Sequence, residues 1–148
     1  MRMIIRSEQF DALVDAAMVN FAWRLAMHIR RTLPEARVSQ IGRTSTVAEM
    51  NGKDLETLVR CGIDRAKQFE LSWESTIAKF VSLMVEVAPN FYQHPGLYQR
   101  LANKKIHQQI RIDSLFTAID DSIWEEAVAD YDPRAWTAKE AMVEESAS

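Results

Sequence analysis

Apolar residues recur at three- and four-residue steps over most of the chain, the spacing that places them on one face of a helix. The first such stripe follows Ser7, a residue that can cap a helix N-terminus. It ends at Leu33, because a residue before proline is disfavoured in the helical region. We predict a long first helix over residues 10–33, with the stripe Phe10, Val14, Ala17, Phe21, Leu25 and Ile29.

The periodicity lapses between Glu35 and Gly52, where the sequence VSQIGRTSTVAEMNG is rich in Ser, Thr and Gly. This composition is typical of a connection between elements. We expect an exposed, mobile segment with one short helical turn at 47–50. No segment alternates apolar and polar residues long enough to predict a sheet, apart from a weak signal at 1–5.

Helical spacing returns over 55–69, with Gly62 on the apolar face, where it allows another backbone to approach. Ser72 is the predicted cap of a third helix, which Pro89 ends. An aromatic corner at 91–96 and a short helix at 97–102 follow. The stripe then continues through Ile106, Ile110, Leu115 or Phe116, Ile119, Ile123 and Ala127, as one helix broken near Asp113-Ser114 or as two helices.

Together these elements predict an all-α fold, a compact single-domain bundle of about five or six helices. The bundle is expected over 1–133. A C-terminal segment over 134–148, partly helical after Thr137 and frayed, is expected to follow. The chain has 148 residues, 47% of them hydrophobic, which suits one globular domain.

No apolar run approaches the roughly 20 residues that a membrane span requires, and the N-terminus has no run of signal-peptide length. We therefore expect a cytoplasmic protein with no membrane partner. The lone Cys61 lies in a helical pattern and is expected to be a buried thiol.

The candidate chemistry is sparse. The three histidines, His28, His94 and His107, have no metal-ligand spacing and are interpreted as solvated or capping residues. No nucleophile motif or glycine-rich phosphate loop occurs. An acidic cluster is interpreted as a solvated face rather than a cation site: Asp120, Asp121, Glu125 and Glu126. We expect no catalytic residue, no metal and no cofactor, and hence a protein that is not an enzyme.

Charge is distributed unevenly, although the net charge is only −3. Residues 91–112, the basic segment, contain no acidic residue, whereas 113–148 is strongly acidic. The basic segment suits binding to nucleic acid or to an acidic protein, or else pairs internally with the acidic region. We expect internal pairing, because an isoelectric point near 5.6 disfavours nucleic acid.

Two tryptophans fall off the core stripes, and exposed tryptophans often anchor interfaces. The alternative is that Trp23 widens the core face of the first helix and Trp136 packs the C-terminal segment onto the bundle. The candidate partner-binding residues are Trp23, Tyr92, Tyr98, Arg100, Lys104, Lys105, Arg111 and Trp136.

The runs Gly62-Ile63-Asp64-Arg65-Ala66-Lys67-Gln68-Phe69-Glu70-Leu71, Ser72-Trp73-Glu74, Phe80-Val81-Ser82-Leu83-Met84 and Pro89-Asn90-Phe91 resemble a family of small uncharacterised helical proteins. These are encoded in bacterial type VI secretion clusters, near spike, effector and effector-loading genes. The family often has glycine before the turn to the aromatic residue, where this chain has Ala88-Pro89. No catalytic residues come with the resemblance.

The resemblance implies an accessory role, as a co-chaperone or adaptor that helps to load a secreted effector. The expected partner is another protein, such as the effector or its loading chaperone, and a homo-oligomer is compatible with the sequence. The alternatives are an immunity protein that neutralises a toxin, a nucleic-acid binder using the basic segment, and an enzyme with an unfamiliar site around His94 and His107.

Overall fold

The computed structural model describes the backbone of residues 7–137 and the side chains of residues 20–136. Within these residues the fold is a helical domain with six α-helices and one two-stranded sheet, which confirms the predicted fold class. No described helix is both long enough and apolar enough to cross a membrane.

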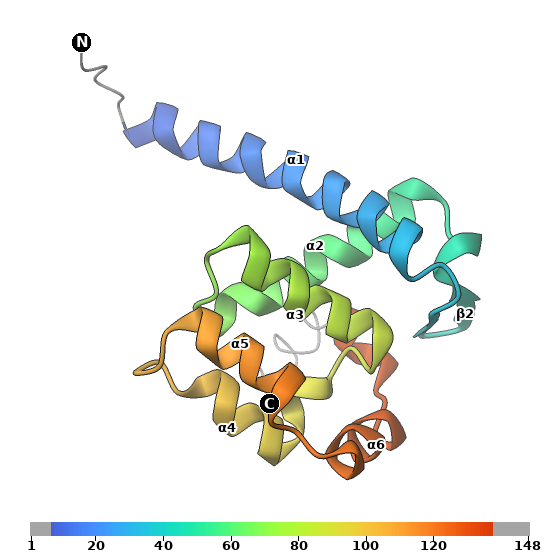
Figure 1. The fold of residues 1–148 in the computed structure, drawn as a ribbon. Coiled ribbons are helices and arrows are strands. Elements are labelled where there is room, and N and C mark those ends of the chain that lie inside the picture. The colour runs from blue at the N-terminus through green and yellow to red at the C-terminus, as the bar shows by residue number, and fades with distance from the viewer. Residues whose placement is uncertain (1–6, 138–148) are drawn as a thin grey trace, which may run out of the picture.

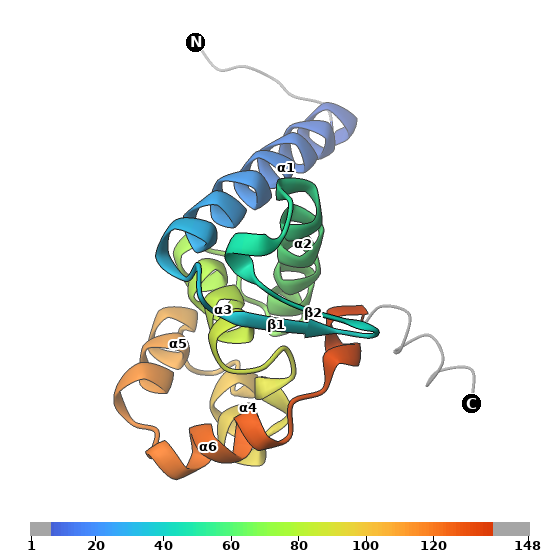
Figure 2. The same cartoon turned by 90° about the vertical axis from the view of Figure 1, so that its right-hand side faces the viewer.

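Helix α1 (Ser7–Thr32) is the long first helix of the prediction, and it ends one residue before Leu33. Its C-terminal half packs on α2 (Gly52–Gln68) and α3 (Glu74–Glu86) through Phe21, Leu25 and Ile29, all buried. Its N-terminal half runs on past the other elements in both views (Figures 1 and 2). The predicted cap at Ser7 lies outside the described side chains, as do the expected signal at 1–5 and helix after Thr137.

The segment after α1 is not the exposed connection that its composition predicts. Strands β1 (Arg37–Gln40) and β2 (Arg43–Thr46) pair antiparallel, with Gln40 opposite Arg43 across a two-residue turn. Gly42 supplies the positive φ of 76° that this turn needs. The helical turn expected at 47–50 is a 3-10 helix, η1 (Val47–Glu49), and it holds Val47 fully buried.

Helices α2 and α3 are the centre of the fold, and they approach closely at Gly62. A Cβ atom at this position would lie 3.0 Å from a methyl group of Val81, so the glycine makes room for a side chain of α3 and not, as predicted, for another backbone. The largest fully buried side chains here include Leu55, Ile77 and Phe80.

The cap of α3 differs from the prediction, because Trp73 rather than Ser72 is the N-cap residue and its side chain makes no capping bond. Instead, Oε1 of Gln108, on a later helix, accepts hydrogen bonds from the backbone N–H groups of Ser72 and Trp73 at 2.9 and 3.0 Å. It also accepts one from the Thr76 hydroxyl at 2.7 Å. A side chain of another element thus binds the backbone at the start of this helix.

The predicted aromatic corner is the 3-10 helix η2 (Phe91–Gln93), followed by α4 (Pro95–Ala102). The next stretch is two helices, α5 (Gln108–Thr117) and α6 (Asp121–Ala129). The break between them falls at 118–120, five residues after the predicted position. Figure 1 shows α4, α5 and α6 together at one end of the molecule, away from α1.

The described end of the chain folds back onto the domain. Residues 133–137 form the 3-10 helix η3 (Pro133–Thr137), which contacts α2 and β1 (Figure 2). The buried side chain of Asn90 binds the backbone just before this helix. It donates to the Asp130 carbonyl and accepts from the Asp132 N–H, both at 2.9 Å. The boundary predicted after 133 therefore falls inside a packed 3-10 helix.

Candidate functional site

Three of the residues predicted to bind a partner lie in the interior and not on the surface. Tyr92, Arg111 and Trp136 are each only 4% exposed. Tyr92 stacks on Phe80, with ring centroids 5.8 Å apart, and burial raises the pKa of its hydroxyl to about 12. Trp136 belongs to the hydrophobic core, which is the alternative weighed for it.

Arg111 has a structural role that its place in a basic segment conceals. Its Nη1 donates to the carbonyls of Phe69 and Leu101 at 2.8 and 2.7 Å, and its Nε donates to the carbonyl of Ile106 at 3.0 Å. Phe69 is the C-cap of α2, and Leu101 lies in the last turn of α4. The guanidinium group therefore neutralises the negative ends of two helices at once, and it is not available to a partner.

The other five predicted residues are exposed, but they do not form one surface. Trp23 is 45% exposed, and its ring lies against Gly52 at the start of α2. The rest lie on α4 and on the turn after it. They are Tyr98, Arg100, Lys104 and Lys105.

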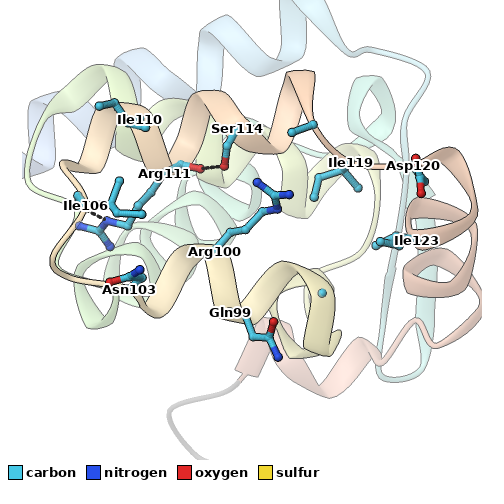
Figure 3. A pocket seen from close by; sticks show the side chains of 12 residues that line it. Gln99, Arg100, Asn103, Ile106, Ile110, Arg111, Ser114, Ile119, Asp120 and Ile123 are labelled. Carbon is cyan, nitrogen blue, oxygen red and sulfur yellow. Dashed lines mark hydrogen bonds between the residues drawn. The ribbon is translucent and has the colours of Figure 1, made fainter.

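A groove of about 670 Å³ lies between α4, α5 and α6, and Figure 3 shows it from close by. We call it the α4–α6 groove. One side is formed by Ile106 and Ile110, and the far end by Ile119 and Ile123. Gln99 and Asn103 lie along α4 at its edge. The groove therefore combines aliphatic and polar side chains in its lining.

Arg100 extends from α4 into this groove, toward the space between Ser114 and Ile119 (Figure 3). Among the described ion pairs none involves Arg100. The acidic residue of the lining, Asp120, lies at the α6 end, so the groove has a positive middle and a negative end.

We expect from the sequence that the basic segment pairs with the acidic C-terminal region. Most of the described ion pairs and hydrogen bonds of the basic segment do not join these two regions. Lys104 pairs with Glu70 on the α2 side at 3.6 Å, and Arg111 binds backbone carbonyls. A link between the two regions does come from His94, whose Nε2 lies 3.0 Å from a carboxylate oxygen of Glu126. The arginine and lysine charges of this segment are otherwise directed to solvent, to the groove or to backbone.

Sequence reasoning missed the apolar residues around the groove, because it assigned them to the core. Ile106 and Ile110 are 40% and 60% exposed, and Phe116 on the same helix is 54% exposed. The buried residues of α5 are instead Arg111, Ile112 and Leu115. Of the two residues that the sequence offers for the apolar stripe, Leu115 is therefore the buried one. Phe116 instead lines a second hollow, of about 580 Å³, beside α3.

A charged pair borders this second hollow. Lys79 on α3 donates to a carboxylate oxygen of Asp113 on α5 at 3.0 Å. This hydrogen bond holds the pKa of the Asp113 carboxyl below its usual value. Because both side chains are nearly half exposed, the pair orients the two helices more than it stabilises them.

Two of the histidines act as helix caps, as the sequence interpretation allows. Nδ1 of His94 accepts from the Gly96 N–H, and Nδ1 of His107 accepts from the Gln109 N–H, both at 3.1 Å. His94 then reaches Glu126, whereas the ring of His107 lies edge-on to Trp73 with centroids 4.7 Å apart. The two imidazoles thus serve different local contacts and do not share one site.

Within the described part of the chain, no group of three or more His, Cys, Asp or Glu side chains is placed to hold a metal ion. Cys61 is half-buried and not fully buried as predicted, and its Sγ lies 3.6 Å from the Ala135 carbonyl oxygen.

Comparisons with known proteins add no relative to this picture. No protein-family model matches the chain, and neither a curated protein nor a solved structure matches it.

Proposed function

We propose that this chain is a non-catalytic accessory protein that binds another protein through the surface around α5. The observation that carries the proposal is the exposure of Ile106, Ile110 and Phe116 on and beside one short helix. Large apolar side chains gathered on a surface mark sites of protein contact.

The surroundings of these residues support protein contact further. Hollows lie on both sides of α5, and Arg100 extends into one of them. Arginine and aromatic residues such as Phe116 are enriched in protein interfaces, while lysine and glutamate are depleted there. The net charge of −3 and the Asp120 carboxylate disfavour a nucleic-acid backbone as the occupant.

The resemblance to proteins of type VI secretion clusters makes a secreted effector, or the chaperone that loads it, the expected partner. In this role the chain is a co-chaperone or adaptor. The proposal of an effector rests on that resemblance, whereas the proposal of a protein partner rests on the surface itself.

Site-specific photocrosslinking in secretion-competent cells tests the proposal. A photoreactive amino acid at Ile110 should give a discrete crosslinked species with another protein after irradiation. The same group at Lys53, an exposed position at the start of α2, is the matched control and should give none. No species at Ile110, or equal species at both positions, would contradict the proposal.

The identity of the crosslinked protein separates the accessory role from the immunity role. An effector or a loading chaperone supports the accessory role. A toxin whose activity falls on binding, in cells that become sensitive to sibling attack when the gene is deleted, would instead make this an immunity protein.

A further inference from the structure

The chemistry of the α4–α6 groove indicates what kind of segment it receives. We infer that the groove binds an amphipathic helix of the partner, which inserts aliphatic side chains between the isoleucines and presents a carboxylate to Arg100. This inference rests on the proposed function and names the partner's recognition element.

The isoleucines of the groove favour apolar side chains in its occupant. Ile106 and Ile110 lie on the α5 side, Ile119 and Ile123 lie toward α6, and the first two are 40% and 60% exposed. Covering apolar surface contributes about 25 cal/mol for each Å² removed from water. The volume of about 670 Å³ lies within the range of sites that accept ligand groups.

Arg100 adds a requirement for negative charge. Its guanidinium group extends into the groove, and no described ion pair involves it. A planar guanidinium can bind a carboxylate through two parallel hydrogen bonds. Once an occupant covers the isoleucines and excludes water, this charge pair becomes stronger because the local dielectric constant falls. An occupant without a carboxylate would leave a covered positive charge unpaired.

The surrounding elements favour a helix over an extended strand. Helices α4 and α5 lie along the two long sides of the groove in Figure 3, and the sheet edges of β1 and β2 lie elsewhere in the fold (Figure 2). A strand would therefore find no sheet edge to pair with, whereas a helix satisfies its own backbone and offers only side chains. The amide side chains of Gln99 and Asn103 at the rim suit the polar flank of such a helix.

The charges near the groove determine where along the ligand helix an acidic residue is favourable. The basic segment contains no carboxylate, while Asp120 lies at the α6 end. A complementary helix therefore carries its acidic residue near α4 and no second acidic residue near α6. This pattern distinguishes it from a uniformly acidic peptide, which Asp120 would repel.

Fluorescence anisotropy with two synthetic peptides tests the inference. Both are 16-residue amphipathic helices with leucine at i, i+3, i+4 and i+7; one has a central glutamate beside this stripe, and the other has lysine there. We expect saturable binding of the glutamate peptide, at least about tenfold tighter than that of the lysine peptide, because a covered charge pair is worth more than about 1.4 kcal/mol.

Two charge-reversed variants of the full chain test whether Arg100 causes the preference for the glutamate peptide. Arg100→Glu should weaken binding of the glutamate peptide about tenfold or more and should improve binding of the lysine peptide. Lys105→Glu, an exposed reversal outside the groove lining, is the matched control and should change either affinity by less than about threefold. Circular dichroism confirms that both variants are folded.

Several outcomes would overturn the inference. These are absence of saturable binding by the glutamate peptide, equal binding of both peptides, and equal effects of the two variants. Displacement of the glutamate peptide by oleate would assign the groove to an amphiphilic carboxylate instead. A dimer that Ile110→Glu dissociates would assign it to a second copy of the chain.

Failure here is distinguishable from failure of the proposed function. If the crosslink from Ile110 persists in the Arg100→Glu variant with unchanged yield, the chain binds a protein but does not use the carboxylate contact. If the crosslink is absent while the glutamate peptide binds selectively, the groove has the inferred chemistry but the proposed function is contradicted.

Discussion

Single side chains in this protein take roles that depend on what surrounds them more than on their charge. Arg111 is a basic residue in a basic segment, yet the structure uses it to bind three backbone carbonyls in the interior. Arg100, eleven positions earlier, extends into an open groove. The sequence indicates that both are cations near each other, but only the positions of the α2 and α4 ends decide which of the two is buried.

Tyr92 gives a prediction at this scale, because its buried hydroxyl has no hydrogen-bond partner among the described residues. Tyr92→Phe removes an unsatisfied polar group and keeps the ring contacts with Phe80 and Phe91. We expect the free energy of unfolding at pH 7 to rise by about 1 kcal/mol. Urea denaturation of the variant and the native protein measures it, and a loss of stability would show that the hydroxyl has a partner.

The raised pKa of the same hydroxyl predicts that the free energy of unfolding depends on pH. Its pKa is about 12 in the folded protein and 10 in the unfolded chain, so at pH below 10 both states keep the proton. Between pH 10 and 12 the unfolded state ionises first, and the native protein loses stability by about 1.4 kcal/mol per pH unit. Tyr92→Phe should lack this component. If the free energies of unfolding of the two proteins change equally with pH over this range, the raised pKa is contradicted.

At the scale of elements, the helices could be predicted from sequence, since each needs only a periodic stripe and an end signal. The hairpin could not, because β1 buries Val38 alone among its residues and β2 buries none of its own. Such a hairpin is held by its turn at Gly42 and by neighbours distant in sequence. The exposed face of α5 was missed because the spacing joined α5 and α6 in one apolar stripe, whereas α5 buries Arg111, Ile112 and Leu115 and leaves Ile110 and Phe116 exposed.

Variants of Gln108 test whether the start of α3 depends on a side chain of α5. Gln108→Ala leaves the N–H groups of Ser72 and Trp73 and the buried Thr76 hydroxyl without this acceptor. We expect a loss of about 2 kcal/mol in the free energy of unfolding. Gln108→Glu should retain most of the stability, because a carboxylate also accepts these bonds and suits the positive end of α3.

The matched control for this contact is the next residue. The Gln109 amide makes one long hydrogen bond to Asp113, at 3.5 Å, so Gln109→Ala should cost less than about 0.5 kcal/mol in urea denaturation. If the two alanine variants lose equal stability, the loss reflects the helical propensity of α5 and not the capping of α3.

At the scale of the whole molecule, contacts between distant parts of the chain join elements that sequence reasoning kept separate. The sequence predicts a partly helical, frayed segment over 134–148, with packing of Trp136 onto the bundle as one alternative. In the structure Trp136 and Ala135 are buried and Tyr131 reaches β1, 92 residues earlier. A stripe within one helix is visible in a sequence, whereas a contact across 92 residues depends on how all the elements pack. The α4–α6 groove belongs to this second kind, since three helices must meet to form it.

Tyr131 shows how such a contact can be measured. Its hydroxyl accepts from the Ser39 N–H at 2.9 Å, donates to the Ser39 carbonyl at 3.2 Å and accepts from Nε1 of Trp136 at 3.2 Å. Tyr131→Phe removes all three bonds, so we expect a loss of about 1 to 2 kcal/mol. It should also speed hydrogen exchange at the Ser39 amide more than at amides of α3, because the hairpin then opens without global unfolding.

The control is Tyr98→Phe, since that ring is 51% exposed and no described hydrogen bond involves its hydroxyl. This variant should leave both the free energy of unfolding and the exchange at Ser39 unchanged. If Tyr131→Phe instead speeds exchange equally at Ser39 and throughout α3, the hairpin opens only when the whole domain unfolds. The described C-terminal segment would then belong to the same cooperative unit as the helical core, and the hydrogen bonds of Tyr131 would not control a local opening.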